Sequence, residues 1–316
     1  MRRSSGCCLA LGGDVKRLLV VYNPRSSRYA EVREGVLCKV RDLPGYMVGK
    51  YEVEKIGIEG NVTKLTGILQ DGDTVVTAGG DATGVIAVNA ILQSDCRDVT
   101  LAVLPYGNFN DLARTLGTKT FEDIFDEKVK KLYPLEIIVD EKHWRYATCY
   151  VTVGMMAEAV KIYDQSKMRK LLKGKLGRYI GSYTNLAGWY FKNRRKKVWM
   201  PEFKLNGALQ DKRISDYFAV NGRYMARVMK GGESYLEKRT FLSGVGGLVC
   251  FLRLVKFMIE SMLTKVPGME TTGDVLEFND LATVKIQAEG ESQAFTGVKK
   301  IEIKKTEKYL KVMTRR

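Results

Sequence analysis

The chain has 316 residues, 45% of them hydrophobic and 28% charged, which excludes an intrinsically disordered protein and predicts about two globular domains. Lys and Arg total 52 against 36 Asp and Glu, and the net charge of +16 favours an anionic partner: nucleic acid, a membrane surface or a phosphorylated ligand. Because His143 is the only histidine, a His-rich metal site is excluded. The six cysteines lack disulfide or zinc spacing, which indicates reduced thiols in the cytoplasm.

The first part of the chain alternates short apolar strands with helical patterns. This alternation predicts a parallel sheet in a layered α/β domain, with ligands at the carboxyl ends of its strands. The expected strands are 17–23, 51–56, 74–78 and 100–104, and the expected helices run from the turn at 23–27 to about 39 and over 62–69, 84–92 and 112–116.

After Pro134 the pattern becomes β-rich, with alternating polarity. We therefore expect an α/β domain over residues 15–134 and a β-rich domain over 135–316, although the last strands could return to the first domain. Helices are expected at 176–191 and 248–263, and strands at 135–139, 145–153, 198–205, 215–220, 275–278, 283–288, 299–303 and 309–312.

The longest apolar stretch, residues 246–266, is interrupted by Arg253, Lys256 and Glu260, so it does not predict a membrane span. Its apolar residues cover a broad face of a helix. A buried amphipathic helix is one interpretation, and a helix that contacts a membrane surface is the other. The basic charge agrees with attraction to an anionic membrane, which predicts a cytoplasmic, peripherally membrane-associated protein.

A glycine-rich segment, Gly79-Gly80-Asp81-Ala82-Thr83, follows one expected strand and precedes a helix. Glycines there let the backbone approach a phosphate, and the amides of the first helical turn can donate to it. Because many turns contain Gly-Gly-Asp, an ordinary strand–helix turn is the alternative for this segment taken alone.

Further segments fit one known family in the right order, and the sequence resembles the diacylglycerol kinase catalytic-domain family, which includes bacterial lipid kinases and sphingosine kinases. Asn23-Pro24-Arg25-Ser26-Ser27 is similar to its N-P-x-S-G loop, residues 79–83 to G-G-D-G-T, and PYGNFNDLAR at 105–114 to P-x-G-T-x-N-D-x-A-R. Residues 151–160 and 172–178 are similar to the start of the second domain, and 288–291 to a D-G-E element. The resemblance covers about residues 17–313.

The resemblance implies the fold of NAD kinases and diacylglycerol kinases, an α/β nucleotide-binding domain followed by a β-rich lipid-binding domain. It also implies a kinase that uses ATP and Mg²⁺ to phosphorylate a hydroxyl of diacylglycerol or a similar lipid. The implied ATP-binding residues are Asn23, Ser26, Gly79, Gly80, Thr83, Gly107, Asn110 and Asp111. Asp81 and Asp111 would hold magnesium, and the implied catalytic residues are Asp81, Glu289 and Glu291, with either glutamate as general base.

The sequence departs from the family at three positions of the nucleotide loops. Ala82 replaces a glycine, which would introduce strain if that position needs a positive φ. Asn108 and Phe109 replace a threonine and a small residue, and Phe109 adds bulk near the nucleotide. Arg25 and Arg114 are candidate phosphate partners, with a surface role as the alternative for each.

Two other functions remain open. NAD kinases share the glycine-rich loop, but residues 105–114 favour the lipid branch. A catalytically weak pseudokinase that binds nucleotide or lipid is suggested by Ala82 and Phe109. Nucleic acid is not expected as a partner, because the basic run at 192–197 matches no nucleic-acid motif. A homodimer is possible, since lipid kinases of this type often pair.

Overall fold

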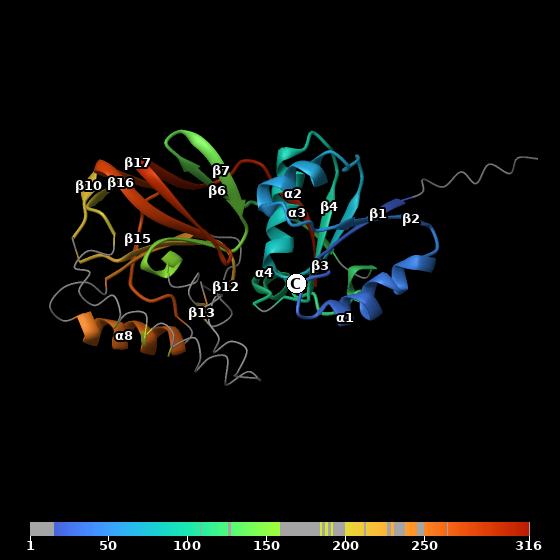
Figure 1. Ribbon diagram of the computed structural model, residues 1–316, viewed down its shortest axis with the longest axis horizontal. Helices are drawn as coiled ribbons and strands as arrows, with labels where there is room; N and C mark the ends of the chain where they lie inside the picture. Colours follow the sequence, from blue (N-terminus) through green and yellow to red (C-terminus); the bar gives the residue numbers. More distant parts are fainter. Residues whose placement is uncertain are drawn as a thin grey trace, which may run out of the picture.

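A computed structural model describes residues 16–315 except 108, 126–127, 159–183, 185–186, 189–190, 192–199, 212, 226–228, 231–237, 245–249 and 264. Two sheets lie side by side in it (Figure 1). The first is mainly parallel and covered by helices, and the second is antiparallel. The expected fold class, a layered α/β unit followed by a β-rich unit, is therefore confirmed.

The first sheet has six strands in the order β2-β1-β3-β4-β18-β5. The strands β2, β1, β3, β4 and β18 run parallel, and β5 is antiparallel to β18. The central residues of β1, β3 and β4 form continuous buried runs that are mainly apolar, as expected for strands buried on both faces. The strands are β1 (Lys16–Tyr22), β2 (Tyr46–Glu52), β3 (Thr74–Gly79), β4 (Thr100–Pro105), β5 (Lys128–Leu132) and β18 (Leu310–Thr314).

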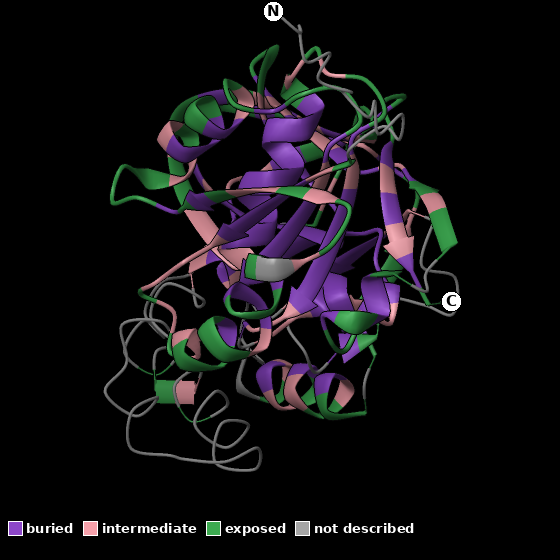
Figure 2. Ribbon diagram, turned by 90° about the vertical axis from the view of Figure 1, so that its right-hand side faces the viewer, coloured by how far each residue is buried: buried purple, intermediate pink, exposed green. Residues whose placement is uncertain are grey.

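Helices cover both faces of this sheet, and their residues become more exposed toward the outside (Figure 2). The helix α3 (Asp81–Gln93) is buried almost throughout because it lies between the first sheet and the second. The other helices are α1 (Tyr29–Val32), α2 (Gly57–Thr66) and α4 (Asp111–Leu116), with a π turn at Arg33–Leu37 and 3₁₀ turns at Lys39–Asp42 and Glu122–Phe125.

The second sheet has the order β15-β14-β11-β8-β16-β17-β6-β7, with β9 and β10 paired beside β16. Its strands are β6 (Leu135–Val139), β7 (Lys142–Ala147), β8 (Tyr150–Gly154), β9 (Phe203–Leu205), β10 (Ala208–Leu209), β11 (Asp216–Val220), β14 (Arg239–Ser243), β15 (Met269–Thr271), β16 (Val275–Ala288) and β17 (Glu291–Lys305). A separate ribbon pairs β12 (Tyr224–Met225) with β13 (Met229–Lys230). The helix α8 (Cys250–Met262) packs against this second unit.

One apolar cluster joins the two units. It runs from β1 and β3 through α3 to Tyr150 on β8, Phe218 on β11 and Phe257 on α8. Asn89 on α3 adds a polar link, because its side-chain amide donates to the carbonyl of Tyr146 and its side-chain oxygen accepts from the Tyr146 amide. This pair of buried hydrogen bonds fixes β7 against α3, so the two units hold a defined relative position.

Several expected elements have the right type but different bounds. The strand expected at 51–56 is β2, which begins at Tyr46 because it pairs in parallel with all of β1. The strand expected at 145–153 is two strands, since the chain turns at Thr148 and Cys149. Residues 275–278 and 283–288 belong to a single strand, β16, with an irregular register between them.

Some strands carry too weak a pattern to be expected from sequence. The strand β5, KVKKL, lies at the edge of the first sheet and has one buried residue. The strand β14 lies between β11 and β15 and pairs with both. The helix expected at 176–191, the segment at 172–178 and the basic run at 192–197 lie almost entirely outside the described residues. The last strand, β18, joins β4 and β5 of the first sheet.

A buried carboxyl in the second sheet has an unusual titration. Asp216 at the start of β11 is fully buried, and desolvation raises its pKa from 3.8 to about 7, although the Met156 amide (2.6 Å) and the Ser215 hydroxyl (2.8 Å) donate to it. Between these pH values the folded protein holds a proton that the unfolded chain has released. The stability contributed by this group is therefore greatest below pH 4 and decreases as the pH rises toward 7.

We expect Asp216→Asn to remove this decrease, which amounts to at most about 1.4 kcal/mol per pH unit. Chemical denaturation at several pH values between 4 and 8 measures it. The control Asp280→Asn removes an exposed carboxyl from β16 and should retain the wild-type slope. Identical slopes for Asp216→Asn and wild type would contradict the prediction.

Candidate active site

A cleft opens where the carboxyl ends of β1, β3 and β4 face the turn between β16 and β17. Its volume is about 330 Å³. Three loops of the first unit and one hairpin of the second form its walls. The lining residues are Asn23, Arg25, Ser26, Ser27, Gly80, Asp81, Ala82, Thr83, Tyr106, Gly107, Phe109, Glu289, Gly290 and Glu291. Most of the residues assigned to the site from sequence therefore lie together.

The loop after β3 depends on small residues. A side chain at Gly79 would collide with the Thr83 side chain. Helix α3 begins at Asp81, and the amides of Thr83 and Gly84 both donate to the Gly80 carbonyl (2.9 and 3.3 Å). The chain thus turns directly from a strand into a buried helix of 13 residues whose N-terminus faces the cleft. Such an arrangement suits a phosphate group.

Ala82 does not meet the condition under which strain was expected, a positive φ. It is the second residue of α3, and it is not among the described residues with positive φ. A helical backbone accepts alanine better than glycine, so the substitution favours the helix. Its methyl group does line the cleft.

The loop after β4 contacts the loop after β3. A methyl group on Gly107 would lie 2.8 Å from the Gly80 Cα and 3.1 Å from the Asp81 amide nitrogen, so only glycine fits. Asn110 adopts the left-handed conformation (φ 55°, ψ 36°) before α4, and its side-chain oxygen accepts from the Gly107 amide at 2.5 Å. The left-handed backbone turns the chain into α4 and brings Asp111 to the cavity.

Asp81 joins these two loops electrostatically. Its carboxylate accepts from the Phe109 amide (3.3 Å) and from the amides of Asn110 and Asp111. Burial raises the pKa of Asp81, and these amides oppose the rise. Asn108 lies outside the described residues, whereas Phe109 lines the cleft, as its position in the sequence predicts.

Glu289 enters the site from the second sheet. Glu289 and Gly290 form a two-residue turn between β16 and β17, with φ of 51° and 92°. This turn type needs positive φ at both positions, and glutamate adopts it only at an energetic cost. One carboxylate oxygen, Oε1, accepts from the amides of Thr148 (2.7 Å) and Cys149 (2.5 Å) and from the Thr148 hydroxyl. These bonds hold the turn in place.

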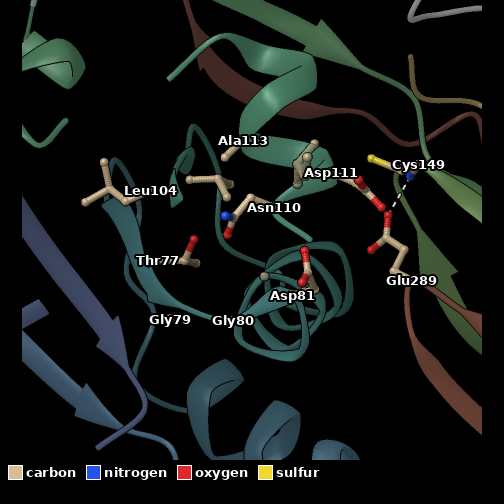
Figure 3. A pocket seen from close by; sticks show the side chains of 13 residues that line it. Thr77, Gly79, Gly80, Asp81, Leu104, Asn110, Asp111, Ala113, Cys149 and Glu289 are labelled. Atoms are coloured by element: carbon tan, nitrogen blue, oxygen red, sulfur yellow. Dashed lines mark hydrogen bonds between the residues drawn. The ribbon is translucent and has the colours of Figure 1, made fainter. Parts of the chain in front are cut away.

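The carboxylates of Asp81, Asp111 and Glu289 point into one cavity beside the cleft, which we call the inner cavity (Figure 3). Burial raises the pKa of Glu289 above its usual 4.5, and the charge of Asp81 raises it further. The buried Tyr150 phenol has a pKa well above its usual value, first from burial and then from the charges of these carboxylates. Acidic groups are thus concentrated in a buried part of the molecule.

The carboxylates of the site fit a magnesium ion that takes most of its coordinating oxygens from a bound phosphate and from water. In the part of the chain that the structure describes, no three acidic, His or Cys side chains meet at metal-binding spacing. Mg²⁺ in nucleotide sites takes one or two carboxylates and completes its shell with phosphate and water oxygens. Asp81 and Asp111, which line one cavity, would supply these carboxylates.

The predicted residues fall into two adjoining groups. Asn23, Ser26, Thr83, Gly107 and Glu291 line the cleft, Gly79, Asn110 and Asp111 line the inner cavity, and Gly80, Asp81 and Glu289 line both. Arg25 also lines the cleft, where it donates to the carbonyls of Val53 and Glu54, whereas Arg114 lies outside both groups. The role of each residue stays a prediction.

Sequence reasoning missed Thr148 and Cys149. Their amides bind Glu289, but backbone amides have no sequence signal. Thr77 and Tyr106, which line the two cavities, were also missed. Tyr106 belongs to the motif at 105–114 and could have been included.

Known proteins are similar to this chain in sequence and fold. Residues 17–139 match the family model "Diacylglycerol kinase catalytic domain". A diacylglycerol kinase of Bacillus subtilis (strain 168) is 29% identical over 171 residues, 52% of this chain, and the match spans 54% of that protein, about half its length.

Solved structures share the fold. A diacylglycerol kinase structure from Bacillus anthracis str. Sterne has a TM-score of 0.59 at 12% identity, covering 96% of this chain and 98% of that one. A second chain from the same organism has a TM-score of 0.62 at 15% identity, with the same coverage. At these identities the structures establish the fold alone.

The contact between the glycine loops predicts opposite effects for two Gly→Ala substitutions. Gly107→Ala should lower the free energy of unfolding by about 1–3 kcal/mol, because its methyl group collides with backbone. Gly84→Ala inside α3 meets open space and should raise it by up to about 1 kcal/mol. Urea denaturation of both variants checks this. Equal effects would contradict the close approach of the loops.

Proposed function

Residues 17–139 match the family model of the diacylglycerol kinase catalytic domain, and on that premise we propose that the chain is an ATP-dependent lipid kinase. It would transfer the γ-phosphate of ATP to a hydroxyl of diacylglycerol or a similar lipid alcohol. We also propose that residues 15–134 bind the nucleotide and residues 135–316 the lipid. The observation that carries the proposal is the cleft in which phosphate-type glycine loops face the carboxylate of Glu289.

The first unit supplies what phosphates require. The N-terminus of α3 faces the cleft, and the two glycine loops let the backbone approach a phosphate closely. Asn23 and Ser26 add polar side chains from the loop after β1. Phosphoryl transfer depends mainly on positioning and charge neutralisation. A bound Mg²⁺, held by Asp81 and Asp111, would neutralise phosphate charge where three carboxylates concentrate negative charge.

Glu289 is the better candidate for the general base. It lines both the cleft and the inner cavity, while Glu291 lines the cleft alone. Burial raises its pKa, which makes the carboxylate more basic at neutral pH. The amides of Thr148 and Cys149 hold one of its oxygens, which fixes the carboxylate toward the cavity. Glu289 would accept the proton of the lipid hydroxyl as the phosphate is transferred.

The exposed face of helix α8, in the second unit, supports membrane contact. Helix α8 buries Leu254 and Phe257, and its other face exposes Leu252, Ile259 and Met262; these three and Leu263, the residue after the helix, are 52–65% exposed. Leu252, Lys256, Ile259 and Leu263 have the i, i+4, i+7, i+11 spacing of one helix face, and the Lys256 side chain is 75% exposed. Among the described residues no helix is long and apolar enough to cross a bilayer. Helix α8 would therefore lie on an anionic membrane surface.

The kinase proposal predicts different effects for the two glutamates. Glu289→Gln should lower kcat for phosphate transfer from radiolabelled ATP to dispersed lipids by at least about a hundredfold, because a general base is lost. Glu291→Gln, the matched control, should lower it less than about tenfold. Equal effects would contradict the assignment of Glu289.

If NAD is added as an acceptor beside the dispersed lipids, the same assay with radiolabelled ATP separates a lipid kinase from an NAD kinase-like enzyme and from a pseudokinase. Labelled NADP without labelled lipid would indicate an NAD kinase-like enzyme, and ATP binding without any product would indicate a pseudokinase. Reversion of Ala82 to glycine should not increase kcat appreciably, because Ala82 fits the helix without strain. A large increase would contradict that conclusion.

The pH profile gives a second test of Glu289. Its raised pKa predicts that kcat/KM decreases on acidification at a pH above the 4.5 that is usual for glutamate. This acidic limb should be absent from the residual activity of Glu289→Gln. An unchanged limb in that variant would assign the titration to another group.

Membrane contact through α8 predicts a loss of vesicle binding in Ile259→Glu/Met262→Glu. Each exposed apolar side chain that enters a bilayer contributes about 1.5–3 kcal/mol, so binding should decrease at least about tenfold. Flotation with vesicles of phosphatidylcholine and phosphatidylglycerol measures it. The control Leu209→Glu/Leu281→Glu adds the same charge at exposed apolar sites on β10 and β16. Equal losses in the two variants would contradict a specific role for α8.

A further inference from the structure

A second hollow lies at the C-terminal end of α4, outside the cleft. Its volume is about 400 Å³, and it shares no lining residue with the cleft or with the inner cavity. The lining residues come from α4 and the turn after it, from the β12–β13 ribbon and from the end of the chain: Arg114, Gly117, Thr118, Lys119, Tyr224 and Arg315. We call it the α4 pocket.

Among the residues that the structure describes, every charged side chain that lines the α4 pocket is a cation. Two acidic residues contact them without lining the pocket: Asp111 lies 3.7 Å from Arg114, and Asp123 lies 2.9 Å from Arg315. Lys119 is exposed and forms no salt bridge with a residue that the structure describes. Among the described residues, Lys119 therefore adds one positive charge to the pocket beyond the two arginines that contact acidic residues.

The cations are held in place by other contacts. The Leu116 carbonyl accepts from the Arg315 amide (3.0 Å) and from the Thr314 hydroxyl (2.8 Å), which fixes the end of β18 to the last turn of α4. The amide of Lys119 donates to Asp123 (3.0 Å). The Arg114 guanidinium lies 4.0 Å from the centre of the Tyr224 ring. Arg114, Lys119 and Arg315 thus present positive charge to one space.

The end of α4 does not oppose an anion here. Helix C-termini carry partial negative charge on their free carbonyls. In α4, however, the Ala113 carbonyl accepts from Gly117 and Thr118, and the Leu116 carbonyl accepts from Thr314 and Arg315. The helix also has only six residues, so its dipole is small.

We propose that the α4 pocket binds a phosphate group, carried by a soluble phosphomonoester or by a phospholipid headgroup. Guanidinium groups match the oxygens of phosphate in a bidentate arrangement, and Lys119 adds a charge that no described acidic residue pairs with. The volume leaves room for the organic part of such a ligand. The proposal does not depend on the kinase reaction, because it concerns binding at residues outside the cleft.

Calorimetric titration of the full chain with inorganic phosphate and with glycerol phosphate tests the proposal. Lys119→Ala/Arg315→Ala should weaken binding roughly tenfold or more, because charge-assisted hydrogen bonds are lost. The control Lys50→Ala/Lys204→Ala removes the same charge from exposed positions on β2 and β9 and should stay within about twofold of wild type. Equal weakening in both double variants would overturn the proposal.

Two further variants separate a lost contact in the α4 pocket from unfolding and from binding in the cleft. Lys119→Ala alone changes one exposed side chain, so weaker binding at an unchanged melting temperature cannot come from unfolding. Arg25→Ala alters the cleft and not the α4 pocket. If Arg25→Ala abolished phosphate binding while Lys119→Ala/Arg315→Ala retained it, the anion would be in the cleft and the proposal would be wrong.

Vesicles distinguish the two sources of the phosphate group. If it is a lipid headgroup, Lys119→Ala/Arg315→Ala should bind phosphatidylcholine vesicles with phosphatidic acid several-fold less than wild type. If it is a soluble phosphomonoester, vesicle binding should be unchanged while binding of glycerol phosphate decreases. If neither decreases, no phosphate binds in the α4 pocket. None of these measurements requires turnover, so they remain valid if the kinase proposal fails.

Discussion

The candidate site depends on the close approach of two backbone loops at Gly80 and Gly107. The strands β3 and β4 are adjacent and parallel, and Gly79 is paired with Pro105, so both loops leave the sheet at the same level. A side chain at Gly107 would collide with the neighbouring loop. Because the backbones touch, the amides of residues 109–111 reach the carboxylate of Asp81, and α4 starts beside α3. The second unit is then fixed against α3 by Asn89 and by a shared apolar cluster.

Strain and buried charge occur together at this site. Asn110 and Glu289 are two of the few described residues other than glycine with positive φ, and both line the inner cavity. Each is held by hydrogen bonds to neighbouring backbone, Asn110 by the Gly107 amide and Glu289 by the amides of Thr148 and Cys149. Backbone strain that is retained in this way is typical of functional sites. Burial of Glu289 in this cavity also raises the pKa of its carboxyl group.

Much of the first unit could be predicted from sequence. Continuous apolar runs and glycine-rich turns located β1, β3, β4 and both glycine-rich loops almost to the residue, because strands buried on both faces and glycines at close contacts tolerate few alternatives. Edge strands such as β5 have no such constraint, and pairing alone decides where β2 begins. Short motifs also placed Glu289 in the site although it lies far along the chain from the glycine loops, but they did not predict its contact with Thr148 and Cys149. That contact uses backbone amides, whose positions only the folded chain defines. Strain at Ala82 was expected only if its φ were positive, and that condition is not met, because α3 begins at Asp81, three residues before the expected helix at 84–92.

A crystal structure with a non-hydrolysable ATP analogue and Mg²⁺ tests the central claim most directly. We predict that the terminal phosphate lies in the cleft, between the amides that follow Gly80 and the carboxylate of Glu289. We also predict that the metal contacts Asp81 or Asp111. A nucleotide bound outside the cleft, or one whose terminal phosphate points away from Glu289, would contradict the proposed kinase site.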